Sequence, residues 1–295
     1  MRAPNPGHIS TVALYGSRNQ EGYIDSIRQL ISGLRERGIS VALEKKLADV
    51  LTDCGYRPSV HNVKVCTHLP EETDIAVSIG GDGTFLRTAR WLQGKEIPIV
   101  GINTGHLGFL AENSSDNTEE TINLICSGEA VRERRLVLEV ENEYLSSSDW
   151  PYALNEVAFM KGAASMIDID ITLDSFHLAT YRADGLIVGT PTGSTAYNLS
   201  VGGPILAPTL QNIILAPIAP HTLTLRPVVV GGDSEIIAKV ESRASEFRLS
   251  IDGRQVSVPC GSPIRIRRAT HSVITLRKPG DNFASTMRTK LLWGH

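Results

Sequence analysis

The chain has 295 residues, of which 41% are hydrophobic and 21% are charged, and its formal net charge is −3. This composition is typical of a globular protein and excludes the disordered and fibrous classes, and the length allows two domains of ordinary size. The slight negative charge argues against nucleic acid or an anionic membrane as a partner, and no apolar run approaches the roughly 20 residues that cross a bilayer. Because the N-terminus lacks the apolar core of a secretory signal, we expect a cytoplasmic protein.

Strand and helix patterns alternate through the first 130 residues. Short apolar runs that end in glycine or small polar residues predict strands at 11–16, 39–43, 75–79 and 96–103. Apolar residues at helical spacing predict helices at 24–34, 47–51, 85–92 and 117–125. The alternation predicts an α/β domain with a parallel sheet covered on both faces, which binds ligands beyond the carboxyl ends of its strands.

The most informative turn follows the strand at 75–79. The sequence GGDGT at 80–84 ends that strand and leads into the helix. Glycines let the backbone turn tightly, and the N–H groups at the start of a helix can bind an anion. Asp82, in the middle of the turn, would repel a phosphate, but a phosphotransferase can use it as the base for an acceptor hydroxyl or as a metal ligand. The turn therefore indicates a kinase and leaves the acceptor open.

Helical patterns nearly vanish after residue 130. Short runs that alternate apolar and polar residues, separated by turn signals such as Asp252-Gly253, continue to 273–276 and predict an antiparallel, sandwich-like β-rich domain. We therefore expect an α/β domain at 1–130 and a β-rich domain at 131–282. A last helix near 283–295 is expected to return to the first domain.

A second turn rich in glycine and hydroxyl groups lies inside the β-rich part. A strand at 186–188 runs into Gly189-Thr190-Pro191-Thr192-Gly193, and a short helix follows. Thr192, Ser194 and Thr195 would supply hydroxyl donors beside free N–H groups, although an ordinary helix cap after a proline turn explains the pattern equally well.

Three other polar patterns have a structural interpretation beside a functional one. Asn155 and Glu156 are neighbours in an expected strand, so both can serve one ligand only near a bend or a strand end. Asp168 and Asp170 share a strand face and resemble a metal pair, but their alternation with isoleucines favours a solvated face. The arginine clusters at 132–135 and 265–268 favour a solvated face over a phosphate or subunit contact.

The motifs, taken in order, resemble those of the bacterial NAD kinase family. They are GGDGT at 80–84, NE at 155–156 and TPTGSTAYNLSVGGP at 190–204, with further matches at 101–110, 181–185, 219–227 and 252–255. The GGDG turn alone is weak, because diacylglycerol-type lipid kinases and phosphofructokinases carry close relatives of it. The ordered set is specific.

The resemblance implies both a fold and a reaction. Members of the family transfer the terminal phosphate of ATP, or in some cases polyphosphate, to the adenosine 2′-hydroxyl of NAD. Mg²⁺ or another divalent cation is expected with the ATP, and no residue is assigned as a metal ligand. The family fold is an α/β domain followed by a β-rich domain, with the dinucleotide between them, in homodimers or homotetramers.

The resemblance also implies roles for single residues. Asp82 would be the base or the anchor of the 2′-hydroxyl, and Gly81, Gly83 and Thr84 would line the phosphate path. Asn155 and Glu156 would hold ribose or adenine groups. The remaining substrate-binding residues would be Thr192 and Ser194 in the second turn, Thr195, Ala196 and Tyr197 along the adenine, Asp184 at the nicotinamide end in the same or a neighbouring subunit, Arg182 near a phosphate, and His221 near the transferred phosphate or in the core.

Two other functions stay open at this point. A lipid kinase that shares the GGDGT turn would need an apolar acceptor pocket, whereas the second half of this chain carries polar NE and TGSTAY motifs. A non-catalytic, NADP-binding regulatory protein would retain the fold with a relic kinase site, and the intact Asp82 argues against it. A dehydrogenase is disfavoured, because no G-x-G-x-x-G follows the first strand.

Overall fold

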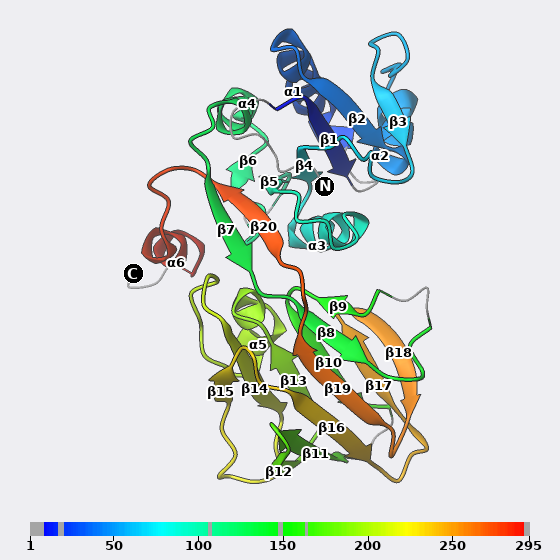
Figure 1. Cartoon of the computed structure of the whole chain (residues 1–295), viewed down its shortest axis with the longest axis vertical. Coiled ribbons are helices and arrows are strands. Elements are labelled where there is room, and N and C mark those ends of the chain that lie inside the picture. The colour runs from blue at the N-terminus through cyan, green and yellow to red at the C-terminus, as the bar shows by residue number, and fades with distance from the viewer. Residues whose placement is uncertain (1–8, 17–20, 106–107, 147–149, 163–164, 292–295) are drawn as a thin grey trace. The chain divides into compact units, whose positions relative to one another are not determined.

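The computed structural model of the chain describes residues 9–16, 21–105, 108–146, 150–162 and 165–291. The chain divides into two compact units, of which the first comprises 1–134 with 273–295 and the second comprises 135–272 (Figure 1). The first unit carries α-helices on a mostly parallel sheet, and the second is built from antiparallel sheets. Both the α/β class and the β-rich class predicted from the sequence are confirmed.

The sheet of the first unit has the strand order β3-β2-β1-β4-β5-β20-β7, with β6 paired to β5. All of its pairings through β1, β2, β4 and β5 are parallel. The strands are β1 (Thr11–Gly16), β2 (Ser40–Glu44), β3 (Lys64–Cys66), β4 (Ile75–Ile79), β5 (Ile99–Asn103), β6 (Asn113–Ser114), β7 (Val131–Arg135) and β20 (Val273–Arg277). The helices are η1 (Glu21–Tyr23), α1 (Ile24–Glu36), α2 (Lys45–Asp53), α3 (Asp82–Trp91), α4 (Thr118–Cys126) and α6 (Phe283–Leu291).

Apolar periodicity explains the first of these helices. The buried residues of α1 include Ile27, Leu30, Ile31 and Leu34, which recur at helical spacing and pack into the core of the first unit. Full burial of such a side chain contributes about 1.5–3 kcal/mol. The helix ends at Glu36, and Gly38 follows with φ +77°, a conformation that glycine adopts without strain. The predicted glycine stop is confirmed.

The strand at 273–277 corrects one prediction. We expected the apolar run at 273–276 in the β-rich domain, because it follows that domain's strands along the chain. It forms β20 instead, which pairs with β5 in the sheet of the first unit. An apolar run shows that a strand is buried, but it carries no information about which sheet takes it. The C-terminal helix that follows is α6, and residues 292–295 lie outside the described residues.

The second unit contains two six-stranded sheets, with the orders β15-β14-β13-β10-β17-β18 and β12-β11-β16-β19-β8-β9. Their inward-facing residues form one apolar cluster that includes Phe159, Tyr181 and Phe247. The strands are β8 (Leu138–Glu141), β9 (Tyr152–Ala153), β10 (Glu156–Lys161), β11 (Ile167–Leu173), β12 (Phe176–Ala183), β13 (Gly185–Gly189), β14 (Asn212–Ile218), β15 (Val228–Gly231), β16 (Ile236–Glu241), β17 (Glu246–Ile251), β18 (Arg254–Pro259) and β19 (Pro263–Arg268). The helices η2 (Thr192–Thr195) and α5 (Tyr197–Ser200) follow β13.

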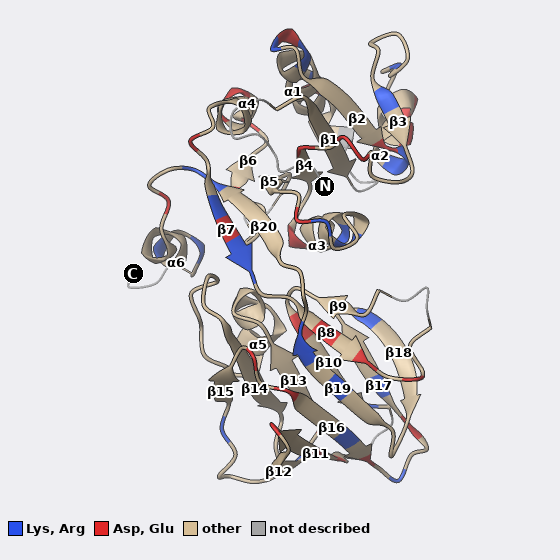
Figure 2. Ribbon diagram, viewed as in Figure 1, with Lys and Arg blue, Asp and Glu red and all other residues tan. Residues whose placement is uncertain are grey.

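Figure 2 marks the basic and acidic residues along the ribbon. The arginine clusters are largely exposed and paired with carboxylates, as the alternation predicted. Arg134 on β7 contacts Glu96 at 2.8 Å, and Arg267 on β19 contacts Glu139 on β8 at 3.0 Å. Arg135 is the exception, because its side chain is only 4% exposed. In these pairs the guanidinium charges are already neutralised by carboxylates of the same unit. The ion pairs therefore argue against a phosphate contact of these arginines. No helix among the described residues is long and apolar enough to cross a membrane.

Candidate active site

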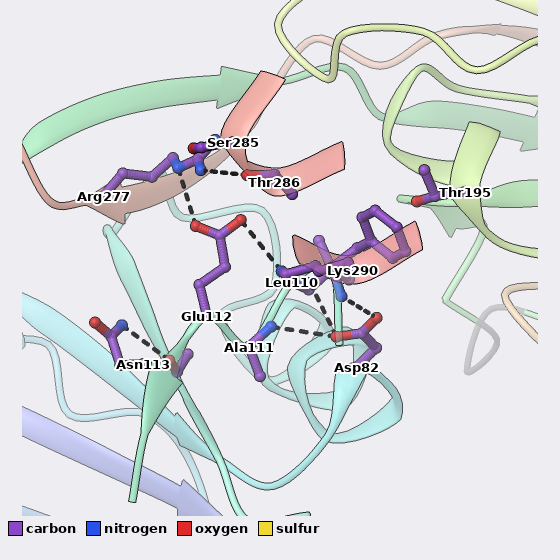
Figure 3. A network of polar contacts seen from close by, with 12 residues as sticks. Asp82, Leu110, Ala111, Glu112, Asn113, Thr195, Arg277, Ser285, Thr286 and Lys290 are labelled. Atoms are coloured by element: carbon purple, nitrogen blue, oxygen red, sulfur yellow. Dashed lines mark hydrogen bonds and ion pairs between the residues drawn. The ribbon is translucent and has the colours of Figure 1, made fainter. Parts of the chain in front are cut away.

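The carboxylate of Asp82 is held by three consecutive backbone N–H groups. Phe109 donates to Oδ2 at 2.8 Å, and Leu110 and Ala111 donate to Oδ1 at 2.9 and 3.2 Å (Figure 3). Asp82 is the first residue of α3, directly after β4. The loop that follows β5 is thus tied to the glycine turn that follows β4. These hydrogen bonds bring the ends of β4 and β5, two of the predicted strand ends, together in one site.

Two glycines make this arrangement possible. Gly80 has φ +145°, and a Cβ there would lie 2.4 Å from Thr84 Oγ1. A Cβ on Gly108 would lie 2.0 Å from Asp82 Oδ1. Because these distances are shorter than any van der Waals contact, a side chain at either position would displace Asp82 or its turn. His106 and Leu107, within the same loop, lie outside the described residues.

The clamp limits what Asp82 can do chemically. A carboxylate offers about four lone-pair positions, and the three N–H groups fill most of them. About one position remains for a substrate hydroxyl, and its direction is fixed by the other three bonds. Gly81 and Gly83, on either side, are exposed, so the backbone of the turn is accessible to a phosphate. This arrangement suits a single, oriented proton acceptor.

Arg87 is a neighbour of this turn that was not predicted from the sequence. Its Nη2 donates to Thr84 Oγ1 at 2.9 Å, and its guanidinium is exposed one turn into α3. Thr84 itself is 4% exposed, and Thr88 donates to its carbonyl at 2.9 Å. The hydroxyl of Thr84, predicted to line the phosphate path, is therefore already engaged within the helix. Arg87 follows Thr84 by three residues on the helix, and this spacing could have predicted that its guanidinium lies beside the turn.

In the second unit, the backbone around Asn155 and Glu156 is held in the same way by Asp252. Its carboxylate accepts the N–H groups of Leu154, Asn155 and Glu156 at 2.7, 2.8 and 3.1 Å. Asp252 and Gly253 have φ +46° and +78°, and they form the tight turn between β17 and β18. Asn155 therefore lies in a bend at the start of β10, which is the strand end that the sequence required.

The NE pair and the glycine-hydroxyl turn of the second unit lie against each other. Thr190 donates its N–H to the Asn155 carbonyl at 2.9 Å and its hydroxyl to the Leu154 carbonyl at 2.5 Å. Its hydroxyl in turn accepts the N–H of Gly193 at 3.0 Å. The NE pair and the glycine-hydroxyl turn are separate in sequence, and β10 and β13 bring them together with Glu156 paired to Gly189.

Glu156 and Asp252 are both partly buried acids, and burial raises the pKa of each. Burial, and secondarily the charge of Asp252, raise the pKa of Glu156 to about 8. Its Oε2 atom and the Oγ1 atom of Thr192 are buried and have no hydrogen-bond partner among the described residues. Two orphaned polar atoms in one small region are typical of a ligand site, where a bound molecule completes the hydrogen bonds.

The rest of the second turn divides into engaged and accessible residues. Ser194 is fully buried, and its hydroxyl bonds the Pro191 carbonyl at 2.6 Å and the Leu206 N–H at 3.0 Å. The predicted substrate contact of Ser194 thus conflicts with its internal bonds, because its hydroxyl fixes the turn. Thr195 and Ala196 are half-buried, and Tyr197 is 40% exposed, so its ring is available for stacking.

Arg182, Asp184 and His221 lie at the far end of β13 from this half-site. The five residues of β13 separate Asp184 from Thr190, about 20 Å along an extended strand. Asp184 contacts Lys161 at 2.7 Å, and the N–H of His221 donates to the Arg182 carbonyl at 2.9 Å. His221 is exposed, which contradicts the alternative of a core histidine. Within the second unit, these three residues form a separate cluster.

The predicted contact of Arg182 with a phosphate competes with an ion pair. Its guanidinium donates to both oxygens of Asp168, at 2.8 and 3.0 Å, and this hydrogen bonding holds the pKa of Asp168 below its ordinary value. Asp170 contacts His177 at 3.2 Å on the same strand face. The two aspartates therefore belong to a solvated, paired face, as their alternation favoured. Across the described residues, no cluster of three His, Cys, Asp or Glu side chains could hold a metal ion.

Comparison with known proteins identifies the family. The model of the ATP-NAD kinase N-terminal domain matches residues 12–130, and that of the ATP-NAD kinase C-terminal domain matches residues 154–277. An NAD kinase of Porphyromonas gingivalis is 42% identical over 288 residues, which cover 97% of this chain and 99% of the relative. An NAD kinase of Bacteroides fragilis is 47% identical over 226 residues, 76% of this chain and 77% of the relative.

Two solved structures share the fold. Yeast NADH kinase complexed with NADH superposes with a TM-score of 0.86 at 24% identity, covering 99% of this chain and 89% of that one. An NAD kinase from Archaeoglobus fulgidus in complex with ATP has a TM-score of 0.70 at 26% identity, covering 96% and 97%. The matches define a two-domain kinase with a nucleotide substrate. The chain belongs to the NAD kinase family.

Proposed function

We propose that this chain is an enzyme that transfers the terminal phosphate of ATP to the 2′-hydroxyl of the adenosine ribose of NAD, forming NADP and ADP. The family assignment, which covers both domains, supports the reaction. The main structural support for the active site is that three backbone N–H groups fix the Asp82 carboxylate at the start of α3.

Asp82 is the group proposed to receive the hydroxyl proton. As the 2′-oxygen forms its bond to the terminal phosphorus, the proton passes to the remaining lone pair of Asp82 and the bond from phosphorus to the ADP oxygen breaks. Phosphoryl transfer depends more on in-line positioning than on covalent help, so a base whose direction is fixed by three bonds suits the reaction. General-base assistance is typically worth about 10²–10⁴-fold in rate.

The phosphate side of the reaction is proposed to use the exposed turn and Arg87. The first N–H groups of α3 and the exposed glycines Gly81 and Gly83 offer backbone donors to the phosphates. The Arg87 guanidinium adds a positive charge one turn along the helix. Mg²⁺ is proposed to arrive with ATP and to offset the phosphate charge. Such binding is typical of Mg²⁺, whose ligands are usually waters and substrate phosphates with one or two protein carboxylates.

The dinucleotide side is proposed to use the second unit. A neutral Glu156 carries an O–H donor and a carbonyl acceptor. The orphaned Thr192 hydroxyl lies in the turn whose Thr190 donates its N–H to the carbonyl of Asn155, the residue before Glu156. Together they can satisfy the mixed donors and acceptors of a ribose or an adenine edge. The Tyr197 ring, 40% exposed, is proposed to stack on the adenine. Thr195 and Ala196 connect these two parts of the site.

We further propose that the chain works as a homodimer or homotetramer. The separation of Asp184, Arg182 and His221 from Glu156 along β13 supports this, because one chain offers the two clusters at opposite ends of a strand. In this proposal Asp184 of one copy binds the nicotinamide end of a dinucleotide held by another. A mass of one chain by light scattering, with full activity, would exclude it.

The function is tested by incubating the purified protein with NAD, ATP and Mg²⁺ and assaying NADP. Formation of NADP supports the proposal. No NADP, combined with retained NADP binding, would support the regulatory alternative, and phosphorylation of a lipid in place of NAD would support the lipid kinase. Side-by-side rates with ATP and polyphosphate, and with NAD and NADH, identify the donor and the acceptor range.

A further inference from the structure

The C-terminal helix α6 is attached to the first unit by polar contacts. None of its residues is fully buried, and its amphipathic character is weak for a surface helix. Its nine residues would be marginally stable alone. Its polar contacts with other elements of that unit include Arg277 Nη2, which donates to Thr286 Oγ1 at 3.1 Å, and Lys290 Nζ, which lies 3.5 Å from Glu112 Oε1 (Figure 3).

Lys290 is buried against the loop that holds Asp82. Its side chain is 5% exposed, and its ammonium lies 5.2 Å from the centre of the Phe109 ring. Its second neighbour, Glu112, directly follows Ala111. Phe109 and Ala111 are the first and last of the three residues whose N–H groups bond Asp82. One lysine on α6 therefore contacts the loop on both sides of the three-bond clamp.

Arg277 strengthens the same contact from β20. Its Nε lies 2.9 Å from Glu112 Oε2, and its side chain is 6% exposed. Glu112 thus receives one cation from β20 and another from α6, and its own side chain is 18% exposed. The partner carboxylate and both cations are largely withdrawn from water. Loss of Glu112 would remove the carboxylate that both cations share, which is destabilising for buried charges. Loss of Lys290 would leave Glu112 paired with Arg277 but would remove the contact of the loop with α6.

The electrostatics agree with this arrangement. Burial lowers the pKa of Lys290, and the carboxylates of Glu112 and Asp82 act against that shift. The ammonium has no hydrogen-bond partner among the described residues, so ion pairing and the aromatic ring are what hold it.

We propose that Lys290 is a positioning residue for the phosphoryl transfer: by holding Glu112 and Phe109, it fixes the three N–H groups that orient Asp82. The inference rests on the proposed role of Asp82. The C-terminal helix lies outside both family-model matches. The inference gives this helix a role in the rate of phosphoryl transfer. It predicts an effect on the rate of transfer and little effect on the affinity for NAD, because Lys290 acts through the loop.

The test compares Lys290→Met with Lys290→Arg and with a matched control, Lys278→Met. Lys278 belongs to the same C-terminal segment and pairs with Glu120 at 2.6 Å, on α4. Since a misplacement of about 1 Å can cost about 10²-fold in rate, Lys290→Met should lower kcat at least about tenfold, with KM for NAD changed less than about threefold. Lys290→Arg should restore most of the rate, and Lys278→Met should match the wild type. An unchanged kcat in Lys290→Met would overturn the proposal.

Two further readouts keep the proposal testable if Lys290→Met folds poorly or the wild type proves inactive on NAD. Glu112→Gln removes the partner charge without altering α6, and the pair should be non-additive: the double variant should lose little more than either single one. Hydrogen exchange at the amides of residues 109–111 should quicken in both single variants, whatever the activity. Unchanged exchange at these amides would refute the positioning role, whereas absent NADP formation with faster exchange would refute only the proposed reaction.

Discussion

Gly193 lies directly against the backbone of Asn155: a Cβ at Gly193 would be 2.0 Å from the Asn155 carbonyl oxygen and 2.5 Å from its carbonyl carbon. That carbonyl also accepts the N–H of Thr190 at 2.9 Å. The second glycine-hydroxyl turn and the NE pair therefore form one rigid unit, and the fit depends on the absence of a side chain at one position.

Gly193→Ala should accordingly push the turn away from Asn155. Overpacking of a rigid backbone contact typically costs about 1–3 kcal/mol, and the affinity for NAD should fall together with stability. Thermal unfolding and NAD titration measure the two effects. Gly189→Ala is the matched control, because its Cβ would find its nearest atom at 3.8 Å. A Gly193→Ala protein as stable as that control would show that the contact is not tight.

Gly108→Ala should affect the first half of the site in a parallel way. Its Cβ would lie 2.0 Å from Asp82 Oδ1, so the carboxylate must move or rotate. Because the base would lose its fixed direction, we expect turnover to fall by about 10²-fold. Gly105→Ala, in the same loop, meets nothing within 4 Å and should change turnover far less. Equal rates for the two variants would argue against the close approach.

Glu156 should give the enzyme a recognisable pH dependence. Its pKa is about 8 in the folded protein, against roughly 4.3 in an unfolded chain, so the folded state binds the extra proton between these values. The stability that this proton contributes is fully present below about pH 4.3 and is lost as the pH rises through about 8. Stability should fall by up to about 1.4 kcal/mol per pH unit in that window.

Glu156→Gln tests this dependence, because glutamine keeps the shape and the mixed hydrogen bonding of the neutral acid. The variant should lose the excess pH slope of unfolding and should keep its NAD affinity above pH 8, where the wild type weakens. Chemical denaturation and NAD titration from pH 6 to 9 measure both quantities. A wild type and a variant with parallel pH profiles would contradict a neutral Glu156.

Asp252→Asn isolates the second carboxylate clamp. Asparagine tolerates φ +46° as aspartate does, so the backbone conformation is preserved while one acceptor oxygen is replaced by a donor. The N–H groups of Leu154, Asn155 and Glu156 would then lack full pairing, at a cost of about 1–3 kcal/mol. Asp174→Asn is the control, because Asp174 also has positive φ, at +48°, and accepts the N–H of Glu235 at 2.8 Å, but is exposed, so water can replace a lost bond. Equal unfolding free energies for the two variants would argue against the clamp.

The elements around the site could be predicted from sequence because the signals are local. The apolar run at 75–79 followed by GGDGT predicted β4 and the start of α3, and the Asn155–Glu156 pair required a strand end, which the structure contains. These inferences use only neighbours along the chain: apolar periodicity, glycine turns and the alternation of strand faces.

The tertiary contacts of the same residues could not be predicted. Asp82 is bonded to amides 27–29 residues further along, and Asp252 to amides about 100 residues earlier, and neither bond leaves a pattern in the sequence. For the same reason Ser194 was interpreted as a ligand contact, although its hydroxyl closes the turn onto Leu206. The apolar strand at 273–277 likewise carries no mark of the sheet that it joins.

The most direct test of the catalytic role is the turnover of Asp82→Asn. The purified wild type and variant would be compared at saturating NAD, ATP and Mg²⁺, with NADP formation and NAD binding measured on the same preparations. We predict that the variant binds NAD nearly as well as the wild type but forms NADP about 10²–10⁴-fold more slowly. A folded Asp82→Asn protein with the wild-type turnover number would contradict the assignment of Asp82 as the base.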